Sequence, residues 1–275
     1  MKIKKVICIY FSPTGTTEKI IKGISQGLNT ERVEFVNISK QLNRKDVFKK
    51  FKDALVVLGT PVYYGRVPEI VAAYLSKLEA NKTPVVLTVV YGNRAYEDSL
   101  RELHDIAISN NFIPVAGGAF VAEHSYSSSD YPIARGRPDH IDLQKSEEFG
   151  AAIQDKIGSL KSLEELSSLE IPGEFPYVVP TNLHMIEEAR SFVDLTPETD
   201  LQKCTLCGNC AEVCPTEAIS HEDFSQTDKW KCLICFACIK VCPESARQMK
   251  ELNFKAAIQM LHQKCHIRKD PEWYL

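Results

Sequence analysis

The chain has 275 residues, a formal net charge of −3 and a charged fraction of 25%. This balance argues against a general nucleic-acid-binding surface, and no apolar run approaches the roughly 20 residues of a membrane-spanning helix. Eight of the ten cysteines lie between Cys204 and Cys242, which indicates metal ligation in a reducing cytoplasm rather than disulfide bonds.

The N-terminal part of the chain alternates short apolar runs with longer amphipathic segments. Runs rich in Val and Ile predict strands that are buried on both faces of a parallel sheet, over residues 5–11, 33–38, 54–59, 84–90 and 112–122. The first run follows a basic start that imitates a secretory leader, but its apolar part is too short for one. Helical patterns are found over residues 18–28, 68–78, 96–110 and 139–160. Five strands that alternate with helices predict a doubly wound, five-stranded α/β domain over residues 1–160.

The rest of the chain predicts a linker, a small domain and a tail. Residues 161–200 hold Pro172, Pro176, Pro180 and Pro197 among Ser, Glu and apolar residues, with one short helix expected around 184–192. This segment is too apolar for a solvated tether, so we expect it to pack along the α/β domain. The cysteine block occupies residues 201–250. Residues 251–275 form an amphipathic tail, whose terminal "EWYL" is expected to add a further contact.

The cysteine block is an internal repeat. "CTLCGNCAEVCP" begins at Cys204 and "CLICFACIKVCP" at Cys232, so every cysteine and the following proline recur at one constant offset along the chain. Three closely spaced thiolates surround one corner of a compact cluster, and the fourth, just before a proline, reaches the other cluster. Zinc is the alternative, but its sites usually separate two Cys-x-x-Cys pairs by a longer excursion.

This spacing resembles that of bacterial-type ferredoxins with two [4Fe-4S] clusters, over about residues 200–250. The pattern assigns the first cluster to Cys204, Cys207, Cys210 and Cys242. It assigns the second cluster to Cys232, Cys235, Cys238 and Cys214. The predicted small domain is therefore an α+β two-cluster ferredoxin domain.

The loop "YFSPTGTTE" at residues 10–18 lacks the lysine of a nucleotide-triphosphate loop and the glycines of a dinucleotide loop. It joins the carboxyl end of the first predicted strand to a helix, so that hydroxyls, backbone N–H groups and the helix dipole converge on one anionic group. A plain Ser/Thr helix cap is the alternative. Two more loops at the same sheet edge, "GTPVYYGRVP" and "VVYGNRAYED", carry glycines and aromatics, which favours a flat ring beside a phosphate.

With these loops and "EHSYS", residues 1 to about 150 resemble the FMN domain of flavodoxins, and the whole chain resembles a flavodoxin/ferredoxin fusion of the kind found chiefly in anaerobic bacteria and archaea. The resemblance implies that FMN is bound by Ser12, Thr14, Gly15, Thr16, Thr17, Thr60, Pro61, Tyr63, Tyr64, Gly65, Tyr91, Gly92 and Asn93. His124 follows the fifth strand and either flanks the flavin or lies exposed in a loop. The ring loops of flavodoxins are commonly acidic, whereas these carry Arg66 and Arg94, with Arg135 and Arg137 farther on, which predicts a positive potential near the ring.

These features predict an electron-transfer protein in which FMN and two [4Fe-4S] clusters exchange electrons with each other and with redox partners: a ferredoxin, a flavodoxin or an oxidoreductase. No acid–base or nucleophilic constellation accompanies the flavin loops. The alternatives are an FMN-dependent reductase of a quinone, flavin or nitroaromatic that the clusters supply with electrons, and a redox sensor with structural clusters. Electron transfer within one chain and transfer across a homodimer both remain open.

Overall fold

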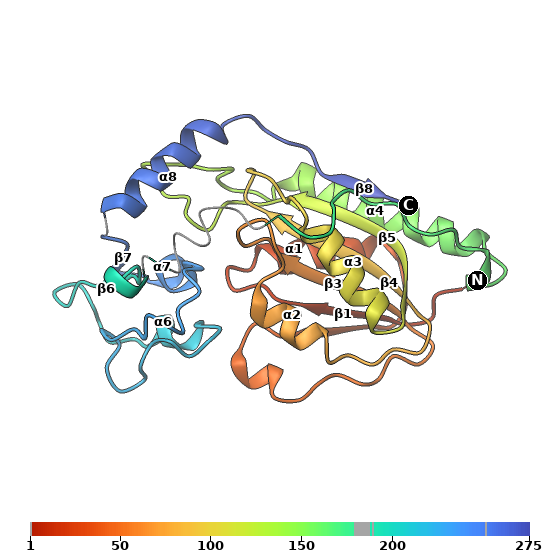
Figure 1. The fold of residues 1–275 in the computed structure, drawn as a ribbon, viewed down its shortest axis with the longest axis horizontal. Helices are drawn as coiled ribbons and strands as arrows, with labels where there is room; N and C mark the ends of the chain where they lie inside the picture. Colours follow the sequence, from red (N-terminus) through yellow and green to blue (C-terminus); the bar gives the residue numbers. More distant parts are fainter. Residues whose placement is uncertain (1, 179–187, 189, 251) are drawn as a thin grey trace.

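The computed structural model describes residues 2–178, 188, 190–250 and 252–275. Its larger part is a six-stranded sheet with helices on both faces, and its smaller part holds the cysteine block (Figure 1). Among the described residues, no helix is both long enough and apolar enough to cross a membrane.

The sheet has the strand order β2-β1-β3-β4-β5-β8. The first five strands pair in parallel, and they are β1 (Val6–Tyr10), β2 (Val33–Asn37), β3 (Leu55–Pro61), β4 (Thr83–Tyr91) and β5 (Phe112–Val121). Every residue of β1 is buried, as its uninterrupted apolar run predicts. The predicted doubly wound α/β fold is confirmed.

The sixth strand, β8 (Glu272–Tyr274), lies where the sequence predicts only a further contact of the tail. It pairs antiparallel with β5, with Tyr274 opposite Gly117. The ring of Trp273 stacks on Phe149 and Phe120, at centroid distances of 5.7 and 6.5 Å. So short a segment has no recognisable strand pattern, and this strand forms because an aromatic site on the sheet receives it.

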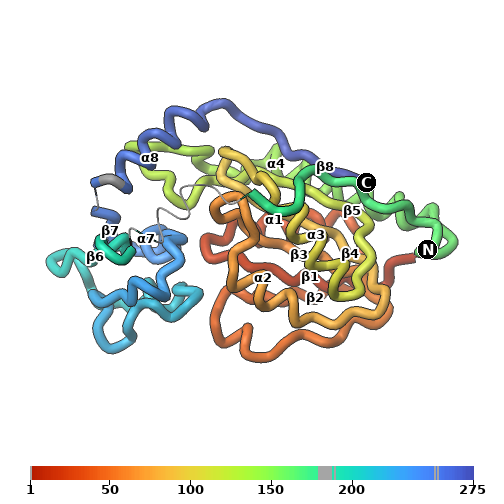
Figure 2. The backbone as a smooth tube through the Cα atoms, viewed as in Figure 1, coloured from red at the N-terminus to blue at the C-terminus, as the bar shows by residue number. Residues whose placement is uncertain are grey.

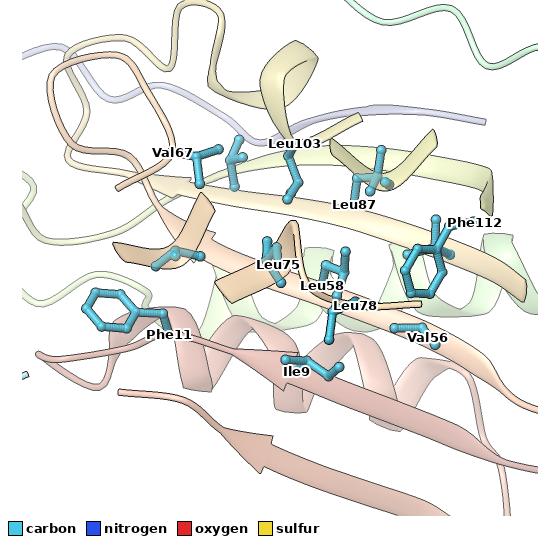
Figure 3. Packing of buried hydrophobic residues seen from close by; sticks show 14 of the residues in the cluster. Ile9, Phe11, Val56, Leu58, Val67, Leu75, Leu78, Leu87, Leu103 and Phe112 are labelled. Atoms are coloured by element: carbon cyan, nitrogen blue, oxygen red, sulfur yellow. The ribbon is translucent and has the colours of Figure 1, made fainter. Parts of the chain in front are cut away.

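Helices cover both faces of the sheet (Figure 1). α2 (Glu69–Leu75) and α3 (Ser99–Ser109) cover one face, and Figure 3 shows Leu75 and Leu103 lying over the strand residues Leu58 and Leu87. α1 (Thr16–Gly27) and α4 (His140–Ser159) cover the other face, where Ile20 and Phe149 belong to a second core. The loops at the carboxyl ends of the strands are left free to form a site.

The segment that follows α4 lies along α3. After the 3-10 turn η2 (Leu163–Glu165), Ile171 packs against the first core, and the buried carboxylate of Asp98 accepts hydrogen bonds from the backbone N–H groups of Glu174 and Val178, at 3.1 and 2.6 Å. Tyr177 donates to Asp105 at 2.9 Å. The short helix expected around 184–192 falls largely outside the described residues, but positions 188 and 190–192 are helical.

The small cysteine-rich part repeats its own backbone geometry. It contains β6 (Glu198–Thr199), which pairs with β7 (Arg247–Gln248), and the short helices α6 (Asn209–Glu212) and α7 (Ala237–Val241). Positive φ angles recur at the offset of the sequence repeat, as the pairs Leu206 and Ile234, Gly208 and Phe236, and Glu217 and Ser245. The sequence repeat is therefore also a structural repeat, with each half turning its chain around a cavity.

The tail returns from the small part to the sheet (Figures 1 and 2). α8 (Leu252–Lys264) packs Phe254 and Ile258 into a core with Phe236 of the small part. Beyond α8, the side-chain amide of Asn93 donates to the carbonyls of Cys265 and Ile267, each at 2.8 Å. The tail thus contacts both parts of the molecule before it ends in β8.

Candidate functional site

A cleft lies at the carboxyl ends of the parallel strands, where an α/β sheet binds its ligands. It consists of two adjoining cavities, of about 430 and 650 Å³, that share Val62, Tyr63, Tyr91, Gly92, His124 and Ser125. The smaller cavity reaches the loop before α1, and the larger one reaches the cysteine-rich part. We call the two together the strand-end cleft.

Hydroxyls line the smaller cavity of this cleft. Thr14, Thr16 and Thr17 border it, and the N–H groups of Thr16 and Thr17 stand at the start of α1, where a helix has no carbonyl partners of its own for them. Gly15 has a φ of +81°, and a Cβ added there would meet no atom within 4 Å, so the loop leaves open space at the start of the helix. These donors and this space fit a terminal phosphate.

Ser12 has a different role from the other loop hydroxyls. Its Oγ accepts a hydrogen bond from the N–H of Glu18 at 3.0 Å, and its own N–H donates to Ser39 Oγ at 2.7 Å. The side chain of Ser12 therefore caps α1, which is the plain alternative that the sequence left open for this loop. It supports the loop and does not line the cleft.

Aromatic side chains line the larger cavity. Tyr63, Tyr64, Tyr91 and Tyr126 border it, and the hydroxyls of Tyr64 and Tyr126 lie 3.4 Å apart. Burial raises the pKa of Tyr63 and Tyr126 well above the usual value and that of Tyr91 to about 12, so these phenols stay neutral and can donate hydrogen bonds. Flat apolar walls with neutral polar edges suit a planar heteroaromatic ring.

His124 borders both cavities of the cleft. Its Nδ1 accepts a hydrogen bond from the N–H of Tyr126 at 3.1 Å, and burial, with Arg94 and Lys240 as positive neighbours, lowers its pKa to about 4. The imidazole is therefore neutral at physiological pH, with its remaining proton on Nε2. A Cβ at Gly92 would collide with this ring, so glycine is required there for His124 to lie against the loop.

Three of the four arginines from which the sequence predicts a positive potential are paired with carboxylates. The fourth, Arg135, is exposed and borders neither cavity of the cleft. Arg66 forms a bidentate pair with Glu102 at 2.7 and 2.8 Å, and Arg94 bonds Glu97 at 2.8 Å. Arg137 is buried against Asp142. Arg94 borders the larger cavity as part of an ion pair, and the residues named here bring little net positive charge to the cleft.

Four of the sequence-predicted FMN residues lie outside the cavity walls: Ser12, Gly15, Thr60 and Asn93. Thr60 is fully buried and donates to the carbonyl of Pro61, and the Asn93 side chain holds the tail. The other predicted residues line the cleft: Thr14, Thr16, Thr17, Pro61, Tyr63, Tyr64, Gly65, Tyr91, Gly92 and His124. Sequence reasoning missed Tyr126, although it is the aromatic residue of "EHSYS" and could have been recognised there. It also missed the distant Leu233, Ile234 and Leu261, for which the sequence has no local signal.

The eight cysteines of the repeat line two separate cavities of similar volume. One, of about 360 Å³, is bordered by Cys204, Cys207, Cys210 and Cys242. The other, of about 350 Å³, is bordered by Cys214, Cys232, Cys235 and Cys238. These are the two crossed sets that the sequence predicts, each with one cysteine from the opposite half of the repeat. We call them the first and second cluster cavities.

Backbone N–H groups point at the cysteine sulfurs. Ala218 N–H donates to Cys214 Sγ and Ala246 N–H donates to Cys242 Sγ, both at 3.2 Å, and Ile234 N–H lies 3.4 Å from Cys232 Sγ. Such bonds stabilise negative charge on sulfur. The donor set, the cavities and these bonds fit iron–sulfur clusters that are held by thiolates.

The second cluster cavity shares a wall with the strand-end cleft. Leu233 and Ile234, between two cysteines of the second set, border both spaces. Tyr126 packs against Phe236 and Phe254 at ring-centroid distances of 4.6 and 5.0 Å, which holds this wall against the sheet edge.

A second contact between the two parts is polar. Lys240 of α7 donates to Glu123 Oε1 at 2.6 Å and to the carbonyl of Ser127 at 2.8 Å. Glu123 borders the smaller cavity of the cleft. The small part therefore contacts the strand-end loops through both apolar and charged side chains.

Comparison with known proteins finds two known domains in the chain. Residues 7–111 match the family model of the flavodoxin domain, and residues 196–243 match that of the 4Fe-4S dicluster domain. Similar solved structures include a flavodoxin from the domain Archaea (15% identity; 56% of this chain and 99% of that chain; TM-score 0.39) and flavodoxin 2 from Bacillus cereus (16%; 55% and 99%; 0.42). A third is a Fusobacterium nucleatum flavodoxin bound to flavin mononucleotide (16%; 57% and 98%; 0.37). No curated protein matches the sequence.

The two matched domains indicate a flavin and iron–sulfur protein of the electron-transfer class. The chain carries a flavodoxin domain followed by a 4Fe-4S dicluster domain, as a flavodoxin/ferredoxin fusion does. The first domain implies FMN, and the second implies iron–sulfur clusters.

We predict that His124 makes stability depend on pH. The unfolded chain protonates this histidine near pH 6.5, whereas its pKa in the folded protein is about 4, so stability falls as the pH falls through this window. Between pH 7.5 and 5.5 the loss is about 1 kcal/mol. Urea unfolding followed by circular dichroism should show this loss in the wild type and in an exposed control, His221→Gln, but not in His124→Gln. Equal pH dependence in all three proteins contradicts the assignment.

Proposed function

We propose that this protein transfers electrons between external redox partners and FMN through two [4Fe-4S] clusters, with the second cluster next to the flavin. The observation that carries the proposal is the wall of Leu233 and Ile234, which borders both the strand-end cleft and the second cluster cavity. Close placement of two redox sites permits electron transfer without dissociation of a partner. In this proposal the chain consists of a flavodoxin-like FMN domain over residues 1–160, a packed linker over 161–200, a two-cluster ferredoxin domain over 201–250 and a C-terminal tail over 251–275.

The first cluster cavity is the better entry point for electrons. Cys207 is exposed, and the neighbouring Leu206 is 67% exposed, so a partner surface can approach this cavity. Cys235 and Cys238 of the second cavity are buried. The order partner, first cluster, second cluster, flavin follows from this difference in exposure.

In this proposal the residues of the cleft bind and orient FMN. Thr14, Thr16, Thr17 and the start of α1 bind the phosphate, and the tyrosines of the larger cavity flank the ring. When bound, FMN accepts one or two electrons, and each cluster exchanges one, so the two clusters together match the capacity of one flavin.

The external donor or acceptor in this proposal is a ferredoxin, a flavodoxin or an oxidoreductase in a reducing cytoplasm. Such a partner supplies the electrons that the clusters pass on, or takes them up when the flow is reversed. Eight thiolate ligands require a reducing environment.

Rapid mixing of the anaerobic holoprotein tests the proposed function. Protein that carries about one FMN and about eight irons is mixed with a donor that reduces the clusters, and the flavin band is followed. We expect flavin reduction at a rate that does not depend on protein concentration. A rate of flavin reduction that falls in proportion to dilution contradicts transfer within a stable unit. Protein that contains zinc in place of iron contradicts the proposed clusters. Saturable turnover of a quinone indicates a reductase instead.

The phosphate site yields a second prediction. Replacing Thr14 and Thr16 by Glu places two negative charges where the phosphate binds, so the protein should lose FMN and keep its iron. FMN and iron contents of the purified variant measure this. The matched control is Ser76→Glu with Ser109→Glu, which adds the same charge at exposed sites at the C-terminal ends of α2 and α3. Riboflavin binding as tight as FMN binding argues against a phosphate site.

Crossed ligation yields a third prediction. Cys242→Ala removes a wall residue of the first cavity, and Cys214→Ala removes its counterpart from the second. The first variant should alter the exposed cluster and the second variant the cluster next to the flavin. Iron analysis with electron paramagnetic resonance (EPR) of the reduced proteins distinguishes them, since damage to the second cluster in Cys242→Ala rules out this ligand set.

A further inference from the structure

The repeat has one chemical break close to the clusters. Each half continues after its Cys-Pro pair to an alanine and one further residue, in "CPTEAI" and "CPESAR". The final positions, Ile219 and Arg247, are separated by the same offset as Cys204 and Cys232. Both are buried, with Arg247 only 2% exposed, so an apolar side chain in one half corresponds to a buried cation in the other.

Arg247 lies between the two cluster cavities and borders both of them. Its Nη1 donates to Thr199 Oγ1 at 2.7 Å, and its Nη2 donates to Thr227 Oγ1 at 2.9 Å. Nη2 also lies 3.9 Å from Cys238 Sγ, a predicted ligand of the second cluster. The guanidinium is thus held in place by two neutral hydroxyls and by the carbonyl of Phe224, which lies 3.4 Å from Nη1, and its nearest anionic candidate is a predicted cluster ligand.

Two features of Arg247 remain unexplained by protein contacts. Its Nε is buried and has no hydrogen-bond partner among the described residues. Unlike Arg66, Arg94 and Arg137, it makes no ion pair with a carboxylate in the described part of the chain. A buried guanidinium without a counter-charge is strongly destabilising, because desolvation is not repaid. An anionic group in the adjoining cavities would compensate the charge and accept the free N–H.

We propose that Arg247 raises the reduction potential of the iron–sulfur clusters, and that of the second cluster more than that of the first. This inference rests on the proposed presence of two clusters. Reduction adds negative charge, which a fixed cation in a low-dielectric interior stabilises, and N–H donors to sulfur act in the same direction. The effect is unequal because Nη2 lies beside Cys238 of the second set. A higher potential there draws electrons from the exposed cluster toward the one next to the flavin.

An EPR-monitored redox titration of the holoprotein tests this role. Arg247→Gln removes the charge and retains hydrogen-bonding capacity, and Arg247→Lys retains the charge. In Arg247→Gln we expect the equilibrium constant for reduction of the second cluster to fall at least tenfold. For one electron, this lowers its midpoint potential by about 59 mV or more. The first cluster should shift less, and Arg247→Lys should remain closer to the wild type. Comparison with Cys207→Ser, which changes a first-cavity cysteine, assigns the two midpoints.

The control is Lys250→Met, which removes a positive charge from the same domain at an exposed position paired with Glu198. Both midpoints should stay unchanged in it, because water screens the lost charge. Unchanged midpoints in an iron-replete Arg247→Gln overturn the proposal, as does an equal fall in Lys250→Met. If Arg247→Gln fails to assemble clusters, Arg247→Lys provides the test. A midpoint potential of its second cluster well below that of the wild type overturns the proposal, because the charge is retained. Wild-type protein without two clusters refutes the proposed function instead.

Discussion

The contact on which the rest of the structure depends is the packing of Tyr126 against Phe236 and Phe254. The carboxyl edge of a parallel sheet is normally an open crevice. Here a strand-end loop, the residue that precedes α7, and α8 meet through aromatic rings, and Ile234 belongs to the same core. This core makes the second cluster cavity and the cleft share a wall, so the proximity that electron transfer requires is a consequence of apolar burial.

The chain outside the two domains restrains their relative position. Asp98 binds the backbone of the linker, Asn93 binds the backbone of the tail, and Trp273 inserts β8 beside β5. Hydrogen bonds from buried side chains to backbone groups are directional, so they restrain these segments more than apolar contact does. Interdomain contacts are often small and permit motion. Aromatic packing, the Lys240–Glu123 pair and the returning tail together favour one arrangement of cleft and cluster.

The sequence predicts those features whose causes are local. Buried parallel strands, helix periodicity and cysteine spacing are encoded within short windows, so the five-stranded order of elements and the two crossed cysteine sets follow from them. β8 and the role of Asn93 depend on partners that are distant in the sequence, and they leave no periodic signal. The arginines show the same limit, since Arg66 and Arg94 look like a positive ring environment until Glu102 and Glu97 are seen beside them. The sequence does mark Arg247 as unusual, because it stands where the other half of the repeat has Ile219. Nothing in the sequence indicates that Arg247 is buried.

Charge is distributed unevenly between the two sites, and this difference suits their functions. The named arginines around the cleft are paired with carboxylates, and its tyrosines and His124 are held neutral by burial, so a ring there is surrounded mainly by dipoles. The cluster domain instead places one buried cation between two cavities, with hydroxyls rather than carboxylates as its partners. Dipoles orient a neutral ring without attracting charge to it, whereas a fixed cation favours the site that receives an electron. The asymmetry of the repeat therefore gives two otherwise similar cavities different electrostatic environments, which is the condition for an electron to move in a preferred direction between them.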